Sequence, residues 1–354
     1  MIDFYNENVS ILEDAKKLDT AVTSDKFIRY NSSRISWNRG LKNDYEKLKK
    51  HDYKPETLRV AMYRPFVKQH YYFDRNFNDM VYQIPRLFPT PQSKNLVICC
   101  SGIGVTKEFS TIITDIIPDL ELIGKSQCFP LYYYEDLNDG GQRTLFDDSE
   151  NTTVRRDGIS DFLLQRCRNE FGYKITKEDI FFYVYGLLHN KQYRNKFSAD
   201  LKKMLPRIPI VKEFWVFSKA GRELADIHLN YEKLPVSTSV SILKQSENYE
   251  VCKMRFPQKG KKDTIIFNSH ITISGIPMRA YDYVVNGKSA IEWAMERYQI
   301  TNDDSSKIVN NPNLWSKEQG DYKYIFNHIL RLITLSIKTV DIVDNLPDIS
   351  AELI

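Results

Sequence analysis

The feature that most constrains the fold is the stretch at residues 176–231, where apolar residues repeat at helical spacing and each repeat ends at a residue that stops a helix. Thr176 predicts the start of a first helix, because a threonine side chain caps exposed backbone N–H groups. Two acids in the first turn suit the helix dipole, and Asn190 predicts the end of the helix. The apolar face consists of Ile180, Val184, Leu187 and Leu188.

Two further helices are predicted in the same stretch. Pro206 ends the second helix, since proline lacks the backbone N–H that a helix interior requires. The apolar stripe of the second helix consists of Tyr193, Phe197, Leu201 and Leu205. The stripe of the third helix consists of Phe214, Phe217, Gly221, Leu224, Ala225 and His228. On physical grounds alone, the three helices form a packed helical core.

The order of residues in this stretch also resembles a known family. The residues that carry the resemblance are IFFYVYGLLHNKQYRNKFSADLKKMLPRIP at 180–209 and FWVFSKAGRELADIHLNYE at 214–232. They resemble the C-terminal specificity domain of Type ISP restriction–modification enzymes. YRPFVKQHYYFDR at 63–75, IPRLFP at 84–89 and the segment at 311–347 fit the same family. The resemblance spans about residues 37–347, and its motifs mark the fold rather than base contacts.

The resemblance implies a function for the chain. Enzymes of this family join a nuclease, a translocase motor, an adenine-N6 methyltransferase and a DNA-recognition domain in a single polypeptide. We therefore expect this chain to recognise a specific sequence of duplex DNA and to position it for the methyltransferase and the motor-nuclease. S-adenosylmethionine, ATP and magnesium are implied only for the full enzyme, and no cofactor is expected in this chain. Whether the chain is a fragment, a truncated frame or a separate subunit is left open.

Composition limits how the chain can bind DNA. Its 50 Lys and Arg residues against 46 Asp and Glu give a net charge of +4, so binding requires local basic patches. No apolar run approaches the roughly 20 residues that cross a bilayer, and no membrane partner is expected. The five cysteines follow no metal-binding or disulfide spacing, which predicts reduced thiols and a cytoplasmic protein.

We expect a mixed α/β fold of the α+β class, with strand-rich N-terminal and C-terminal parts around the central helical segment. Residues 1–55 are expected to be helical, with a polar break near 31–33, and to form the junction to the methyltransferase. Residues 56–157 are predicted to be a strand-rich recognition part, in which 135–158 form a polar, mobile loop. A helical subdomain at 158–235 follows, and a β-hairpin and strand part at 236–354 ends in helices.

Three basic clusters are the candidate DNA-binding residues. The first cluster, at residues 25–50, contains eight basic residues and three acidic residues. Arginine can bind phosphate or read guanine, and aromatic side chains pack on sugars and bases. These residues are predicted to spread around a helix as a rim at the edge of a DNA groove: Arg34, Trp37, Arg39 and Lys42. The alternative is a solvated helix face with Trp37 in the core.

The second cluster lies at residues 253–262, where the flanking segments predict a β-hairpin with Gly260 in its turn. Its cations are predicted to contact phosphates from the hairpin: Lys253, Arg255, Lys259, Lys261 and Lys262. The alternative is a solvated turn. The third cluster is Arg64, Lys68 and Arg75, on and after a predicted strand. In that cluster, a buried Arg64 paired with an acid is the alternative.

Catalytic motifs of the family are missing from the sequence. There is no Asn/Asp-Pro-Pro-aromatic tetrapeptide to hold a flipped adenine, so the chain alone is not expected to methylate DNA. NLVICCSGIGV at 95–105 is typical of a strand entering a glycine loop, but a nucleotide site would require a helix after it; a strand and a turn are the alternative. The histidines show no metal-ligand spacing, and His189 and His228 are expected in the helical core.

Two other functions remain compatible with the sequence. One is a protein-interaction scaffold that docks on a methyltransferase without DNA contact, which a DNA-binding assay would distinguish. The other is a small-molecule S-adenosylmethionine-binding protein built on the loop at Gly102, which a titration with that cofactor would distinguish.

Overall fold

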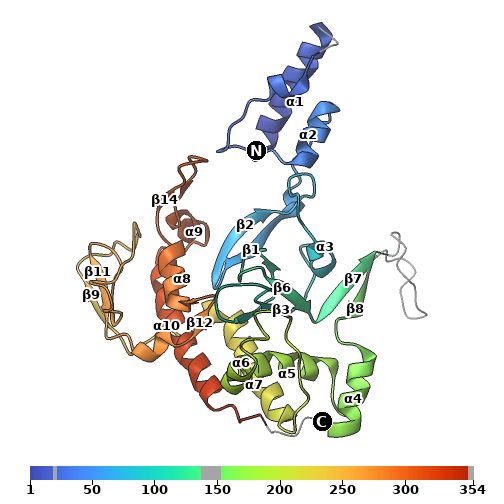
Figure 1. Cartoon of the computed structure of the whole chain (residues 1–354). Helices are drawn as coiled ribbons and strands as arrows, with labels where there is room; N and C mark the ends of the chain where they lie inside the picture. The colour runs from blue at the N-terminus through green and yellow to red at the C-terminus, as the bar shows by residue number, and fades with distance from the viewer. Residues whose placement is uncertain (19–21, 137–152, 350–354) are drawn as a thin grey trace.

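The computed structural model describes residues 1–18, 22–136 and 153–349 and has the mixed α+β architecture that the sequence predicts (Figure 1). The N-terminal unit lies apart from the other elements and contains α1 (Ile2–Leu18) and α2 (Arg39–Glu46). The predicted polar break is confirmed as a turn at residues 32–34. A small core holds this unit together and consists of Tyr5, Val9, Leu12, Ile28, Ile35, Leu41 and Tyr45.

Two three-stranded sheets form the middle of the molecule. In the first, β1 (Leu58–Arg64) pairs with β2 (Val67–Tyr72) antiparallel and with β5 (Ile117–Pro118) parallel, so β2 is an edge strand. In the second, β3 (Val97–Cys100) lies between β4 (Thr111–Thr114) and β6 (Gln127–Pro130), and all pairs are antiparallel.

The second sheet separates two hydrophobic cores. Every residue of β3 and β4 is buried, because successive side chains point to opposite faces and both faces are covered. Val97 and Cys99 belong to the larger core, which α10 (Tyr324–Asp344) also lines, whereas Ile98 and Cys100 belong to the core of the helical subdomain. A strand covered on both faces has no polar alternation, but the four residues of β4 are all β-branched and lie within the part that the sequence predicts to be strand-rich.

The prediction of a loop at 135–158 is wrong at both ends. Tyr132–Asp136 forms β7 and Thr153–Asp157 forms β8, and the two strands pair antiparallel. Neither strand is fully covered, as their partly exposed patterns show, so these strands tolerate polar side chains. Residues 137–152 lie outside the described part of the chain. The short helix α3 (Ile84–Leu87) packs beside β7 (Figure 1).

The helical subdomain contains α4 (Asp161–Phe171), α5 (Lys177–His189), α6 (Lys191–Lys196) and α7 (Phe214–Leu229). Thr176 caps α5 in a capping box with Asp179, as predicted, and Asn190 ends α5 and begins α6. The predicted end of the second helix at Pro206 is wrong, because α6 stops at Lys196 and turns continue to residue 203. Ser198 and Asp200 in this segment favour turns over a helix interior.

The helices α5 and α7 cross at two glycines. A Cβ atom at Gly221 would lie 1.8 Å from the carbonyl oxygen of Phe182, and one at Gly186 would lie 2.2 Å from that of Phe217. Only glycine allows two helix backbones to approach this closely. The crossing therefore fixes how the subdomain packs.

The C-terminal part contains a second group of small sheets. β11 (Ile271–Ser274) lies between β10 (Thr264–Ile266) and β9 (Ser241–Lys244), and β12 (Val284–Val285) forms a hairpin with β13 (Lys288–Ser289). The last pair is β14 (Thr301–Asn302) with β15 (Val309–Asn310). Helices α8 (Ala290–Arg297) and α9 (Asn313–Glu318) precede the long α10. The prediction that this part of the chain ends in helices is therefore confirmed.

His189 and His228 are buried, as expected. Nδ1 of His228 lies 2.6 Å from the hydroxyl of Tyr185, and its Nε2 lies 2.9 Å from Oγ1 of Thr339. Because Tyr185 lies on α5 and Thr339 lies on α10, this histidine links the helical subdomain to the C-terminal helix.

The buried histidines predict a pH dependence of stability. Burial lowers the pKa of His228 to about 3 and that of His328 to about 4, against about 6.5 in an unfolded chain. Between the folded and unfolded pKa values of each histidine, the unfolded chain binds a proton that the folded chain does not. The free energy of unfolding therefore rises with pH in this range, and the contribution of each histidine is lost as the pH falls below about 6.5. We expect a loss of roughly 1.4 kcal/mol per pH unit for each histidine, measured by urea unfolding. His328→Phe should reduce this slope.

Candidate nucleic-acid interface

The first basic cluster lies on the N-terminal unit, but not on a single helix as predicted. Arg34 is in a turn, Trp37 lies in a segment without regular secondary structure, and α2 begins only at Arg39, after the N-cap Asn38. Arg34 and Arg39 are exposed, and neither forms an ion pair with any residue that the structure describes. Lys42 is half-buried and donates a hydrogen bond to the hydroxyl of Tyr30 at 3.2 Å.

Trp37 faces the small core rather than solvent. Its ring centroid lies 5.5 Å from those of Tyr5 and Tyr45, and the side chain is half-buried. This position corresponds to the alternative in which Trp37 is a core residue. Trp37 therefore orients the backbone that carries Arg34 and Arg39, and the two arginines point outward from a rigid aromatic cluster.

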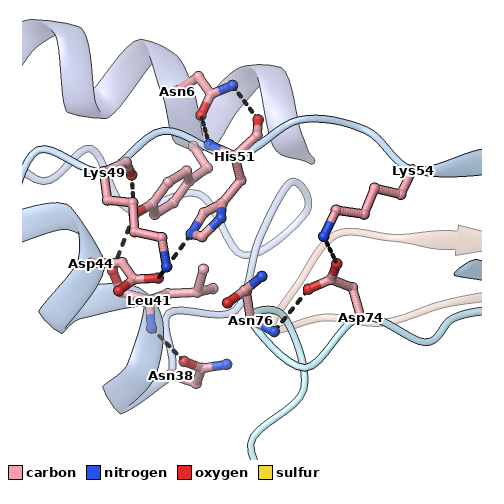
Figure 2. Close-up of polar contacts among 10 residues, drawn as sticks. Asn6, Asn38, Leu41, Asp44, Lys49, His51, Lys54, Asp74 and Asn76 are labelled. Atoms are coloured by element: carbon pink, nitrogen blue, oxygen red, sulfur yellow. Dashed lines mark hydrogen bonds and ion pairs between the residues drawn. The ribbon is translucent and has the colours of Figure 1, made fainter. Parts of the chain in front are cut away.

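Polar contacts fix the N-terminal unit to the strand region (Figure 2). Asn6 of α1 accepts a hydrogen bond from the backbone N–H of His51 at 3.0 Å and donates one to its carbonyl at 2.7 Å. Nε2 of His51 lies 3.0 Å from Oδ2 of Asp44. After β2, Asp74 pairs with Lys54 at 3.5 Å. These contacts tie α1, α2 and the segment after β2 into one assembly.

Arg75 belongs to this assembly. It is exposed, lies directly after Asp74 and makes no ion pair within the described ranges. Phe77, two residues later, packs against Tyr5 and His51 with ring centroids 6.1 and 5.5 Å apart. The structure thus carries Arg34, Arg39 and Arg75 on segments that share one core, although Arg75 is separated from the others in sequence.

The other two residues of the third cluster are paired with acids. Arg64 lies 2.8 Å from Asp119, as its alternative interpretation expected, and stacks over the ring of Tyr63 at 4.2 Å. Lys68 lies 2.6 Å from Glu232, and both side chains are largely covered. The charge of each cation is thereby offset within the protein, so a phosphate would have to compete with a carboxylate already in place.

The predicted β-hairpin at the second cluster is only partly formed. β10 supplies one arm, but the other arm is reduced to a single bridge between Arg255 and Ile266. β11 lies between β10 and β9, so the segment around Arg255 lies along the other, outer edge of β10. Gly260 does occupy the turn, with φ +85°.

The cations of the second cluster differ in their surroundings. Lys262 pairs with Glu292 at 2.7 Å and lies over the ring of Tyr281. Four others are exposed and have no ion pair with a described residue: Lys253, Arg255, Lys259 and Lys261. This cluster lies on the C-terminal part, separate from the N-terminal unit (Figure 1).

Sequence reasoning missed a cleft of about 840 Å³ beside α3. Its walls come from residues 82–87, 120–130, 133 and 158, which only the fold brings together. Polar side chains that line this α3 cleft include Gln83, Arg86, Lys125 and Gln127, together with the acid Glu121, and Arg86 pairs with Glu135 at 3.4 Å. Glutamine and arginine can form paired hydrogen bonds with the edges of adenine and guanine. The only sequence signal was IPRLFP at 84–89, which marked the family and no contact.

Two smaller hollows of about 240 Å³ each continue from the α3 cleft. The first shares Ile84 and Leu120 with the cleft, and the second shares Gln69 and His70 with the first. The two meet at the edge strand β2, and the second extends to Asn311 before α9. A line of concave surface therefore runs from α3 across β2 to α9.

The loop at Gly102 does not form the cofactor site that was considered. The segment after it contains the strand β4 instead of a helix. A Cβ atom at Gly102 would lie 2.1 Å from the carbonyl oxygen of Lys125, so the backbone of another loop fills the space beside this glycine. A phosphate would have neither a helix N-terminus nor free backbone at this position.

In the part of the chain that the structure describes, no helix is long and apolar enough to span a membrane. No curated protein sequence matches the chain significantly.

Several solved structures are similar to this chain, and the three described next each match 99% of its length. One is the ATP-dependent Type ISP restriction–modification enzyme LlaBIII bound to DNA, with 36% identity and a TM-score of 0.85. Another is a nuclease-deletion mutant of the Type ISP enzyme LlaGI in complex with a DNA substrate mimic, with 36% identity and a TM-score of 0.84. The third is a cryoEM structure of a DrdV–DNA complex, with 26% identity and a TM-score of 0.81.

The chain spans only 22%, 30% and 33% of the lengths of these three chains, respectively. The family model of the Type ISP C-terminal specificity domain matches residues 1–328. This protein therefore belongs to the family of Type ISP C-terminal specificity domains.

Proposed function

We propose that this chain recognises a specific sequence of duplex DNA for a Type ISP restriction–modification enzyme. The observation that carries the proposal is the similarity of the whole fold, at 36% identity, to parts of two Type ISP enzymes whose structures contain DNA or a DNA mimic. Affinity would come from cations on phosphates, and specificity from a few polar side chains at base edges.

The geometry supports a division of labour among the candidate residues. Arg34, Arg39 and Arg75 are exposed and without ion pairs in the described chain, so they are available to bind DNA at no cost in broken ion pairs. Gln83 and Gln127 of the α3 cleft are suited to base edges, whereas Arg86 of the same cleft is paired with Glu135. Arg64, Lys68 and Lys262 would instead support the surface, since each is paired with an acid.

The chain would act without chemistry of its own. In the full enzyme, an adenine-N6 methyltransferase and a motor-nuclease would act on the DNA that this domain positions, using S-adenosylmethionine, ATP and magnesium. The N-terminal unit would form the junction to the methyltransferase. The chain would reside in the cytoplasm, where thiols stay reduced, and its five cysteines are free thiols.

Two measurements test the proposal. The chain should bind a pool of random duplex DNA and enrich one sequence over repeated rounds of selection, and it should show neither methyl transfer nor ATP hydrolysis with DNA, S-adenosylmethionine, ATP and magnesium. Absence of DNA binding would favour the scaffold that docks on a methyltransferase without touching DNA. Methyl incorporation above background would show that the chain carries chemistry.

Lys259 and Lys261 are expected to act on phosphates. Changing both to Ala should weaken binding to all duplex sequences alike and reduce the salt dependence by roughly 0.9 per lost contact in log affinity against log salt. The matched control is Lys262→Ala, whose partner is Glu292 and which should leave the salt slope unchanged. A slope that does not respond to the double change would show that the turn is only solvated.

A further inference from the structure

A second concave site lies away from the proposed DNA surface. It is a cavity of about 540 Å³ between the β3–β4 loop, α6, the β12–β13 hairpin and α10, and it shares no lining residue with the α3 cleft. The residues on which the argument depends are Lys107, Phe109, His189, Arg194 and Tyr283.

Arg194 lines this cavity with most of its hydrogen-bonding capacity unused. Its Nε donates to the carbonyl oxygen of Leu188 at 2.6 Å, and its guanidinium carbon lies 5.8 Å from the ring centroid of Phe109. A guanidinium has five N–H donors. Within the described residues, only one of them has an acceptor, and no carboxylate pairs with the charge. A half-buried arginine in this state gains from a bound anion, and phosphate oxygens match its donor geometry.

Two neighbouring polar groups also lack partners. Tyr283 is 6% exposed and His189 is 3% exposed, and neither the hydroxyl of Tyr283 nor Nε2 of His189 has a hydrogen-bond partner in the described chain. Nδ1 of His189 lies 2.9 Å from the carbonyl of Tyr185, so it donates, and Nε2 of the neutral ring can accept. Burial, reinforced by the Arg194 guanidinium, holds the pKa of His189 well below its ordinary value and keeps the ring neutral.

The remaining charges place the cationic part of the cavity at Arg194. Lys107 and Lys191 line it as well, and Lys191 pairs with Asp344. Glu108 and Asp282 also line it, and both are exposed. Arg194 is the most covered of the charged groups, so an anion is most strongly attracted beside it, where less water screens the interaction.

We propose that this cavity binds a phosphate group, with Arg194 and the hydroxyl of Tyr283 as donors and Lys107 at the entrance. His189 would accept a hydrogen bond from a hydroxyl or amine of the same ligand. The phosphate has two possible sources, a free nucleotide or a strand of DNA, and the chemistry that recognises it is the same for both.

Calorimetric titration of the whole chain tests the site with AMP, inorganic phosphate and adenosine. AMP should bind more tightly than phosphate, and adenosine should not bind. Arg194→Gln should weaken AMP binding at least tenfold. The matched control is Lys196→Gln, a cation on the same helix that does not line the cavity, and it should leave AMP binding unchanged. Lys107→Gln, on an exposed loop, should weaken binding severalfold and decides the test if Arg194→Gln does not fold.

A competition experiment with duplex DNA identifies which molecule supplies the phosphate. Displacement of AMP by DNA, with DNA affinity reduced in Arg194→Gln or Lys107→Gln, would assign the phosphate to DNA, whereas AMP binding that DNA does not affect would assign it to a nucleotide. The proposal is overturned if the folded variants bind AMP, phosphate and DNA as well as the unchanged chain does. It is also overturned if AMP and phosphate do not bind and DNA affinity is unaffected by either change. Such failure would leave the proposed function intact, since the cations on the N-terminal unit lie outside this cavity.

Discussion

Gly221→Ala is expected to destabilise the protein by about 3 kcal/mol, because an added methyl group has no space at the crossing of α5 and α7. The Cβ atom would lie 1.8 Å from the carbonyl oxygen of Phe182 and 2.7 Å from the backbone N of Gly186. Both are backbone atoms of a packed helix, so relief requires the two helices to separate rather than a side chain to turn. Urea unfolding followed by circular dichroism measures the change.

The control is Gly40→Ala on α2, where the nearest atom to a new Cβ is the side-chain oxygen of Asn38 at 3.4 Å. Alanine favours a helix by up to about 1 kcal/mol over glycine, so this variant should be neutral or more stable. Gly186→Ala should repeat the loss at the other side of the crossing, where a Cβ would lie 2.2 Å from the carbonyl oxygen of Phe217. If Gly221→Ala unfolds at the same urea concentration as the unchanged chain, the close helix approach is wrong.

Local signals in the sequence were sufficient for most helices. Thr176 and Asn190 marked the ends of α5, and the apolar repeat over residues 214–228 matched α7. These features depend on neighbours within a few residues, which the sequence displays directly. The early end of α6 was missed, because the apolar stripe continues to Leu205 although Ser198 and Asp200 favour turns.

The candidate DNA-binding residues could also be predicted only in part from the sequence. Exposed cations could be found from charge alone, but whether a cation is paired depends on residues far along the chain. Asp119 is 55 residues from Arg64, and Glu232 is 164 residues from Lys68. The α3 cleft gave no local signal for a similar reason, because its polar side chains lie on segments about 40 residues apart. Trp37 could be assigned to either the core or the surface until its ring contacts were known.

The double variant Arg34→Ala, Arg39→Ala is expected to cause the largest loss of DNA affinity among the charge changes. Each arginine should contribute about 1–3 kcal/mol if it reads a base, and less if it holds a phosphate. Both side chains are exposed and without ion pairs in the described part of the chain, so the free energy of unfolding should change little. Gel shifts and thermal melts on the same preparations measure the two quantities.

Two controls separate a DNA contact from a structural effect. Lys219→Ala removes a cation on α7 that is 80% exposed, and it should change neither affinity nor stability. Arg64→Ala breaks the pair with Asp119 and should lower the melting temperature, with a smaller effect on DNA affinity. A base-reading arginine would also relax specificity at one position of the target, whereas a phosphate contact would weaken all sequences alike. If the double variant melts at a lower temperature but binds DNA as tightly as the unchanged chain does, Arg34 and Arg39 are structural and the N-terminal unit does not contact DNA through them.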